Sequence, residues 1–205
     1  MKKIVIGVVG TVIVLIAGIL FAASRQPDTF RVERHVMVRA PAEEIFALVN
    51  DFRAWDAWTP YNRDPAMKKT YGGAPAGAGA TYAWEGNGDV GKGEVAITAA
   101  QAPERIDLDL HMVAPFEARN KVTFTFLREA SQTAVSWSMV GNNNLIGKAM
   151  GLFMDMDKMV GGDFETGLAR LKAAAEKAAA GKAAAAPAAD SAAGTAAEAP
   201  KPPAK

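Results

Sequence analysis

Residues 38–61 read VRAPAEEIFALVNDFRAWDAWTPY, and this stretch decides how the rest of the chain is interpreted. Pro41 suits the first turn of a helix, where its missing N–H costs nothing, and two glutamates follow at the positive end of the helix dipole. Apolar side chains recur at helical spacing over residues 45–52, which predicts a short helix with one buried face. Trp55 and Trp58 come next in a polar segment where we expect the chain to turn.

Segments with a period of two lie on both sides of this helix. Residues 30–39 (FRVERHVMVR) alternate valines with mostly charged residues, which predicts a strand. Further alternating segments follow between residues 68 and 140, and such alternation is typical of antiparallel sheets with one buried face. The turn signals between them are Gly72-Gly73, Gly86-Asn87-Gly88, Ala102-Pro103-Glu104 and residues 128–132.

A second helical pattern follows the strands. Apolar residues step by three or four along residues 152–171, which predicts one long helix over residues 145–177. Gly161 and Gly162 interrupt it, and we expect a bend or break there because each glycine costs a helix about 1 kcal/mol relative to alanine. The order of strand, helix, meander and long helix predicts an α+β fold whose last helix covers the apolar face of the sheet.

Residues 4–23 read IVIGVVGTVIVLIAGILFAA and contain no charged side chain. As a helix this run spans roughly 30 Å, the thickness of the hydrocarbon core of a bilayer. The alternative is a secretory signal peptide, whose apolar stretch is usually about 7 to 15 residues. We therefore expect one uncleaved transmembrane helix after residues 1–3. The basic residues on its two sides nearly balance, and the usual outcome in a bacterium is a single-pass inner (cytoplasmic) membrane protein with a periplasmic domain.

Composition divides the rest of the chain. We expect a polar linker over residues 24–29, a folded domain over residues 30–177 and a disordered tail over residues 178–205, which is rich in Ala, Pro and Lys and cannot offset its chain entropy by burial. The 23 basic and 22 acidic side chains leave a net charge of +1, without a basic stripe, so nucleic acid is not an expected partner. The chain has no cysteine, which excludes disulfide and thiol chemistry.

No catalytic constellation is evident in the sequence. A nucleophilic triad needs a base beside Ser or Cys, yet both histidines, His35 and His111, fall on the polar face of their predicted strands. No cluster has the spacing of metal ligands, so we expect neither a metal nor another cofactor. Glu85 and Glu117 remain as possible buried acids, because burial raises the pKa of a carboxyl group toward the range of a general acid.

Three stretches in this order resemble the SRPBCC superfamily, and within it the polyketide cyclase and dehydrase-like branch. They are residues 38–61, WEGNGDVGKGEV over residues 84–95 and DMDKMVGGDFETGLARLKAAAE over residues 155–176. The resemblance covers residues 30–176. It implies the START-like, or Bet v 1-like, helix-grip fold, in which a curved antiparallel sheet wraps around the long C-terminal helix and encloses an apolar cavity. It implies a hydrophobic ligand but specifies no reaction.

Methionine and aromatic side chains that face such a cavity would line a ligand pocket, since thioethers and rings adapt to varied apolar partners. An ordinary packed core is the alternative interpretation of the same residues. The expected ligand-binding residues are Trp55, Trp58, Tyr82, Trp84, Leu108, Met112, Phe124, Trp137, Met139, Met156, Met159 and Val160.

Taken together, these features predict a membrane-anchored protein that binds a small hydrophobic or lipid-like molecule without catalysis. The anchor would raise the local concentration of the pocket near a ligand that partitions into the bilayer. Two alternatives stay open. A cyclase, aromatase or dehydratase would need polar groups inside the pocket, and Glu85, Glu117, Tyr82 and Tyr71 are the candidates. An envelope protein-interaction or stress factor would use the sheet or the tail.

Overall fold

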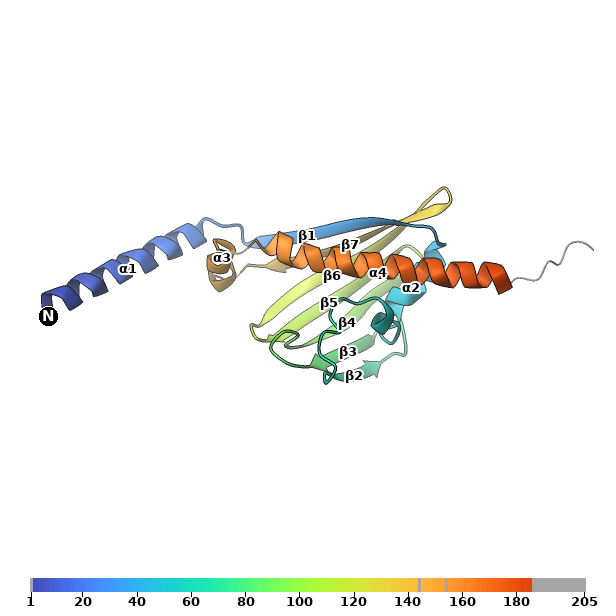
Figure 1. The fold of residues 1–205 in the computed structure, drawn as a ribbon, viewed down its shortest axis with the longest axis horizontal. Coiled ribbons are helices and arrows are strands. Elements are labelled where there is room, and N and C mark those ends of the chain that lie inside the picture. Colours follow the sequence, from blue (N-terminus) through green and yellow to red (C-terminus); the bar gives the residue numbers. More distant parts are fainter. Residues whose placement is uncertain (1, 144, 154, 186–205) are drawn as a thin grey trace, which may run out of the picture.

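The structure is a computed structural model that describes residues 2–143, 145–153 and 155–185 (Figure 1). Its strands are β1 Thr29–Val38, β2 Lys68–Gly73, β3 Ala80–Glu85, β4 Lys92–Gln101, β5 Arg105–Ala114, β6 Ala118–Glu129 and β7 Gln132–Asn142. Its helices are α1 Lys2–Ser24, α2 Ala42–Asn50, the short 3-10 helix η1 Ala54–Ala57, α3 Leu145–Gly151 and α4 Met156–Ala185.

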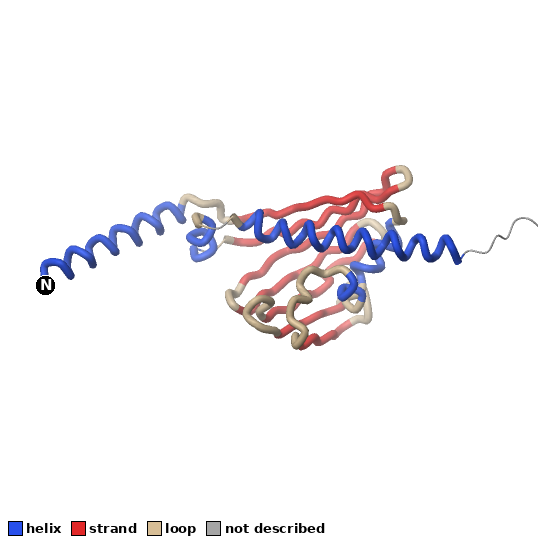
Figure 2. Tube along the Cα trace, in the orientation of Figure 1, coloured by secondary structure: helices blue, strands red, loops and turns tan. Residues whose placement is uncertain are grey.

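The seven strands form one antiparallel sheet in the order β1-β7-β6-β5-β4-β3-β2, so the first strand lies beside the last. The sheet curves, and α4 runs along its concave side in contact with β1 and β7 (Figures 1 and 2). α2 packs on β5 and β6, and η1 follows it. This arrangement confirms the expected α+β, helix-grip-like fold. Gly72 and Gly73 lie within β2, paired with Thr81 and Ala80, so reading them as a turn was wrong.

Residues 38–61 contain the predicted short helix, which is α2. The helix begins directly after Pro41, and Glu43 and Glu44 occupy its first turn. Its apolar face is buried, and the ring of Phe46 meets that of Phe126 on β6 edge to face at 5.8 Å. α2 therefore ties the chain between β1 and β2 to the middle of the sheet.

The final helix breaks earlier than predicted. α3 ends at Gly151 and α4 begins at Met156, where the carboxylate of Asp155 accepts a hydrogen bond from the backbone N–H of Lys158. A side-chain cap of this kind starts a new helix. Gly161 and Gly162 lie inside α4, so the predicted break at these glycines was wrong.

Two glycines of α4 face side chains of the sheet. A side chain at Gly161 would meet the guanidinium of Arg34 on β1, which is the end of a flexible side chain and can move aside. A methyl group at Gly167 would lie 2.7 Å from Cζ3 of Trp137 on β7. The Trp137 ring is held in its stack with Phe164, so the absence of a side chain at Gly167 sets how closely α4 packs.

α4 also extends beyond the predicted domain boundary at residue 177. It continues to Ala185 and includes Gly181, which was expected to lie in a disordered tail. Alanine favours helix, and Lys182 forms an ion pair with Glu44 of α2, which stabilises this last part. The rest of the predicted tail, residues 186–205, lies outside the described residues.

α1 contains the whole apolar run of residues 4–23. Its large apolar side chains are exposed over residues 12–16 and again over residues 19–21. Near its end Ala23 is buried, and α1 contacts α3. Among the residues that the structure describes, no helix is both long and apolar enough to pass through a membrane.

Candidate ligand-binding site

Aromatic rings form a continuous series on the concave face of the sheet. At the β2–β3 edge, Tyr71 stacks on Tyr82 at 5.3 Å between ring centroids, and Tyr82 stacks on Trp84 at 5.8 Å. Phe52, which follows α2, lies 5.9 Å from Tyr82 and 4.9 Å from Trp55. Alternate residues of a strand share a face, which is why Tyr82 and Trp84 stand together.

The series continues under α4. Trp55 lies 5.1 Å from Trp58, and Trp58 meets Trp137 edge to face at 5.7 Å. Trp137 stacks on Phe124 of the neighbouring strand at 4.9 Å and on Phe164 of α4 at 4.0 Å. Aromatic pairs in such geometries contribute about 0.5–1.5 kcal/mol beyond the area they bury. The rings therefore join sheet and helix into one rigid wall.

The expected ligand-binding residues divide by depth. Those that lie in the closed core are Trp58, Leu108, Phe124, Trp137 and Met139. Those that are half-buried are Trp55, Tyr82, Trp84, Met112 and Val160. Met159 is exposed on α4 and lies outside the wall, and the side chain of Met156 lies outside the described residues. The half-buried set is the part of the wall that is partly open to solvent.

Trp137 carries an unsatisfied polar atom. Its Nε1 is buried and has no hydrogen-bond partner among the described residues. The other three tryptophans each donate to a backbone oxygen: Trp55 to Val49 at 2.8 Å, Trp58 to Leu48 at 3.0 Å and Trp84 to Val90 at 3.0 Å. A buried donor without an acceptor costs about 1–3 kcal/mol, so Trp137 Nε1 is an uncompensated polar atom within the closed core.

Asn120 is a second buried polar residue on the concave face, and the sequence analysis did not identify it. Its Oδ1 has no hydrogen-bond partner within the described residues and packs against Gly141 of β7, beside the ring of Phe30. The signal was present in the sequence, because Asn120 shares the parity of Val122 and Phe124. A polar residue among apolar ones on the same face of a strand could therefore have identified it.

The polar groups proposed for an enzyme are not all inside the wall. The side chains of Glu85 and Glu117 are 61% and 70% exposed, so the prediction of buried acids was wrong. Both stand on or beyond the ends of strands, where alternation no longer determines burial. Tyr82 does face the wall, and burial, with the neighbouring Tyr71, raises its pKa to about 12. Its phenol therefore stays protonated at neutral pH and can donate a hydrogen bond.

The opposite, outer face of the sheet holds both histidines. His35 is exposed, and His111 lies between Glu94 and Glu117, with ring nitrogens 3.3 and 3.2 Å from their carboxylates. Within the described part of the chain, no group of three or more His, Cys, Asp or Glu side chains is placed to hold a metal ion.

The outer face of the sheet also carries a cavity of about 280 Å³, lined by Lys68, Thr70, Ala83, Trp84, Glu85, Lys92, Gly93, Glu94, His111 and Val113. Its lining is mostly polar side chains of both charges, so it differs in chemistry from the concave wall.

A curved antiparallel sheet that holds a long helix against an apolar wall defines a helix-grip protein with a ligand-binding fold. Residues 29–176 match the family described as polyketide cyclase / dehydrase and lipid transport, and the chain belongs to that family. The resemblance seen in the sequence is thereby confirmed at the level of the family. A search of curated proteins finds no match to this chain.

Solved structures share the fold. A protein from Chromobacterium violaceum is 18% identical over 73% of this chain and 99% of its own, with a TM-score of 0.52. A protein from Thermus thermophilus is 16% identical over 73% of this chain and 99% of its own, with a TM-score of 0.53. The di-domain ARO/CYC BexL from the BE-7585A biosynthetic pathway is 14% identical over 77% of this chain and 53% of its own, with a TM-score of 0.55. Similarity at this level shows the fold alone.

Proposed function

We propose that this chain binds a small hydrophobic or lipid-like molecule against the concave aromatic wall and does not transform it. One observation carries the proposal: the wall remains half-buried at Tyr82, Trp84 and Met112, although these residues stand on the apolar face of the sheet. Apolar side chains left partly open on a concave surface are typical of ligand sites. The family's description, which includes lipid transport, supports the same function.

The wall also favours a particular kind of molecule. An apolar body would pack on the stacked rings of Tyr82 and Trp84. A carbonyl, hydroxyl or carboxylate oxygen would accept a hydrogen bond from the phenol of Tyr82, which is half-buried on the same wall. An amphipathic molecule with one oxygen-bearing group meets both conditions.

Attachment to a membrane through residues 4–23 is part of this proposal and rests on their sequence alone, because no helix among the described residues qualifies as a membrane span. The run is free of charge, and α1 exposes large apolar side chains such as Ile13 and Val14 to solvent. A bilayer would remove that surface from water. A single pass through the inner membrane with the domain in the periplasm follows the usual signal-anchor outcome. A reporter fused after Lys205, scored for periplasmic or cytoplasmic activity, tests this orientation.

Native mass spectrometry of the full chain, released from mild detergent, tests ligand binding. We expect co-purified apolar molecules on the wild type and their loss in Met112→Lys, which places a charge on the wall. Val113→Lys is the matched control, because Val113 is the next residue of β5 and faces the outer side of the sheet. An empty wild-type chain, or equal loss in both variants, would contradict the proposal.

A cyclase-type reaction is the second candidate, and Tyr82 is the observation that favours it. A protonated phenol beside an apolar wall can orient a carbonyl group. Loss of a measured turnover in Tyr82→Phe, with ligand binding unchanged, would favour the enzyme over the binding protein.

A further inference from the structure

Several segments of the chain meet at one end of the sheet. Thr29 at the start of β1 pairs with Asn142 at the end of β7, so α1 and α3 both lie beyond this end. Met112 near the end of β5 pairs with Ala118 at the start of β6, which places the turn of residues 115–117 there as well. Figure 1 shows α1 leaving the domain at this end, next to α3 and the start of α4.

Large apolar side chains are exposed at this end. Phe116 in the β5–β6 turn is 60% exposed, Leu145 of α3 is 51% exposed and Phe153 between α3 and α4 is 74% exposed. We refer to these three residues as the end patch. They come from separate segments, so no single turn or helix accounts for their exposure. Exposed apolar groups that gather on one surface mark a site of interaction.

We infer that the end patch inserts into the interface of a lipid bilayer, beside the point where α1 enters it. This inference rests on the membrane attachment proposed above and adds a docked orientation of the domain. A lipid bilayer is the partner that fits this patch, because the patch lies at the end of the sheet where α1 leaves the domain. α1 contacts α3 directly, and the backbone N–H of Asn143 donates to Asp28 O at 2.8 Å, so α3 with Leu145 is held beside the apolar helix, and Phe116 lies at the same end of the sheet. Aromatic side chains such as Phe116 and Phe153 suit the headgroup region next to a membrane helix.

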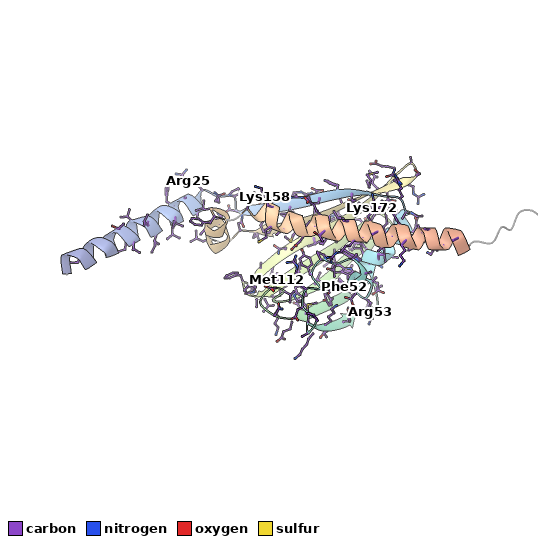
Figure 3. All side chains as sticks on the ribbon, viewed as in Figure 1. Arg25, Phe52, Arg53, Met112, Lys158 and Lys172 are labelled. Carbon is purple, nitrogen blue, oxygen red and sulfur yellow. The ribbon has the colours of Figure 1, made fainter. Side chains whose placement is uncertain are left out.

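Docking in this orientation would bring the concave wall to the membrane. Met112, the half-buried wall residue nearest the β5–β6 turn, belongs to the same end of the sheet. Figure 3 places Met112 toward the end that carries Arg25 and Lys158, whereas Phe52 and Arg53 lie further along the domain. A lipid-like molecule leaving the bilayer would therefore meet the wall at Met112 without crossing water.

Site-specific fluorescence on the full chain tests the inference. The sequence has no cysteine, so a single introduced thiol carries the only label. We would attach an environment-sensitive fluorophore to Phe116→Cys, Phe153→Cys, Leu15→Cys and Leu127→Cys in phosphatidylcholine–phosphatidylglycerol vesicles that also contain a quencher-bearing lipid. Leu15 reports on α1. Leu127 is the matched control, because it is 63% exposed but lies near the β6–β7 turn at the opposite end of the sheet.

We expect blue-shifted, lipid-quenched emission from the labels at 15, 116 and 153, and aqueous emission from the label at 127. Aqueous emission at 116 and 153 with quenching at 15 would overturn the docked orientation and leave the attachment standing. Aqueous emission at 15 as well would overturn the attachment itself. Quenching at 127 equal to that at 116 would show adsorption without a preferred face, which also overturns the docking.

Discussion

The concave face has two halves that share one sequence pattern but differ in burial. Under α4, Phe124, Trp137 and Phe164 are closed off from solvent and stacked. Across β3 and β5, Tyr82 and Met112 alternate with outward residues in the same way but stay half-buried. The difference follows the helices that cover the face: α4 contacts β1 and β7, and α2 contacts β5 and β6, so Leu108 is buried whereas Met112, near the end of β5, is not. The covered part holds the fold together, and the half-open part is where we propose that a ligand binds.

The sharpest way to break this comparison is to truncate one tryptophan in each half. Trp58 is fully buried, and its replacement in Trp58→Ala removes two edge-to-face contacts and the hydrogen bond to Leu48 O. We expect a loss of about 3–5 kcal/mol in the free energy of unfolding. Trp84→Ala should cost clearly less because Trp84 is half-buried. Thermal and denaturant unfolding followed by circular dichroism measure both, and equal losses would show that the two halves are one core.

Two glycines of α4 test how closely the helix must approach its half of the face. Gly167→Ala places a methyl group 2.7 Å from Trp137 Cζ3 and 3.1 Å from Pro60 Cδ, and we expect it to lower stability by about 1–3 kcal/mol. Gly162→Ala is the control, since nothing lies within 4 Å of the added methyl group, and it should stabilise the helix by up to about 1 kcal/mol. The same unfolding measurements apply. If both substitutions lowered the stability, or both raised it, close packing at Gly167 would not be what sets the position of α4.

Trp137 belongs to the closed half, and Trp137→Phe tests that placement. The change removes an N–H that has no partner among the described residues while keeping a ring at the stack. We expect stability to hold or to rise by up to about 1 kcal/mol, because an unpaired buried donor is removed, and ligand affinity to stay unchanged. Unfolding measurements and titration of the extracted ligand into the purified full-length variant check the two expectations. A loss of affinity would show that the ligand reaches the closed half.

The smallest effect concerns the ion pairs that hold α4 to β1. Arg34 donates to both carboxylate oxygens of Asp157, at 3.0 and 2.9 Å, and to Glu165 at 2.8 Å. The hydrogen bonds from Arg34 hold the pKa of Asp157 below its ordinary value of 3.8. The pair therefore stabilises the fold above that value, and its contribution is lost as the pH falls through the lower pKa of the folded state. Asp157→Asn should flatten the stability profile as the pH falls through and below 3.8, whereas an unaltered profile would mean that the pair contributes nothing.

Local sequence patterns predicted the secondary-structure elements well but their boundaries poorly. The alternation in residues 30–39 and the helical spacing in residues 45–52 both lead to observed elements. The helix boundary at Asp155 was missed because the apolar stripe runs without interruption from residue 152 to residue 171 and outweighed the capping signal of Asp155. The role of Gly161 was misjudged because the residue that faces it, Arg34, lies far away along the chain.

The sequence alone determined the class of fold, because hydrophobic periodicity and element order are local properties that leave few arrangements for a buried sheet face and one long helix. It also marked which side chains stand on the apolar face. The tertiary structure decided how deep each of them lies. It closed Trp58 and Phe124 into the core, left Tyr82 and Met112 half-open and moved Met159 to the surface. Burial depends on which distant segment of the chain packs on a face, and the hydrophobic periodicity of a strand or helix does not show which segment that is.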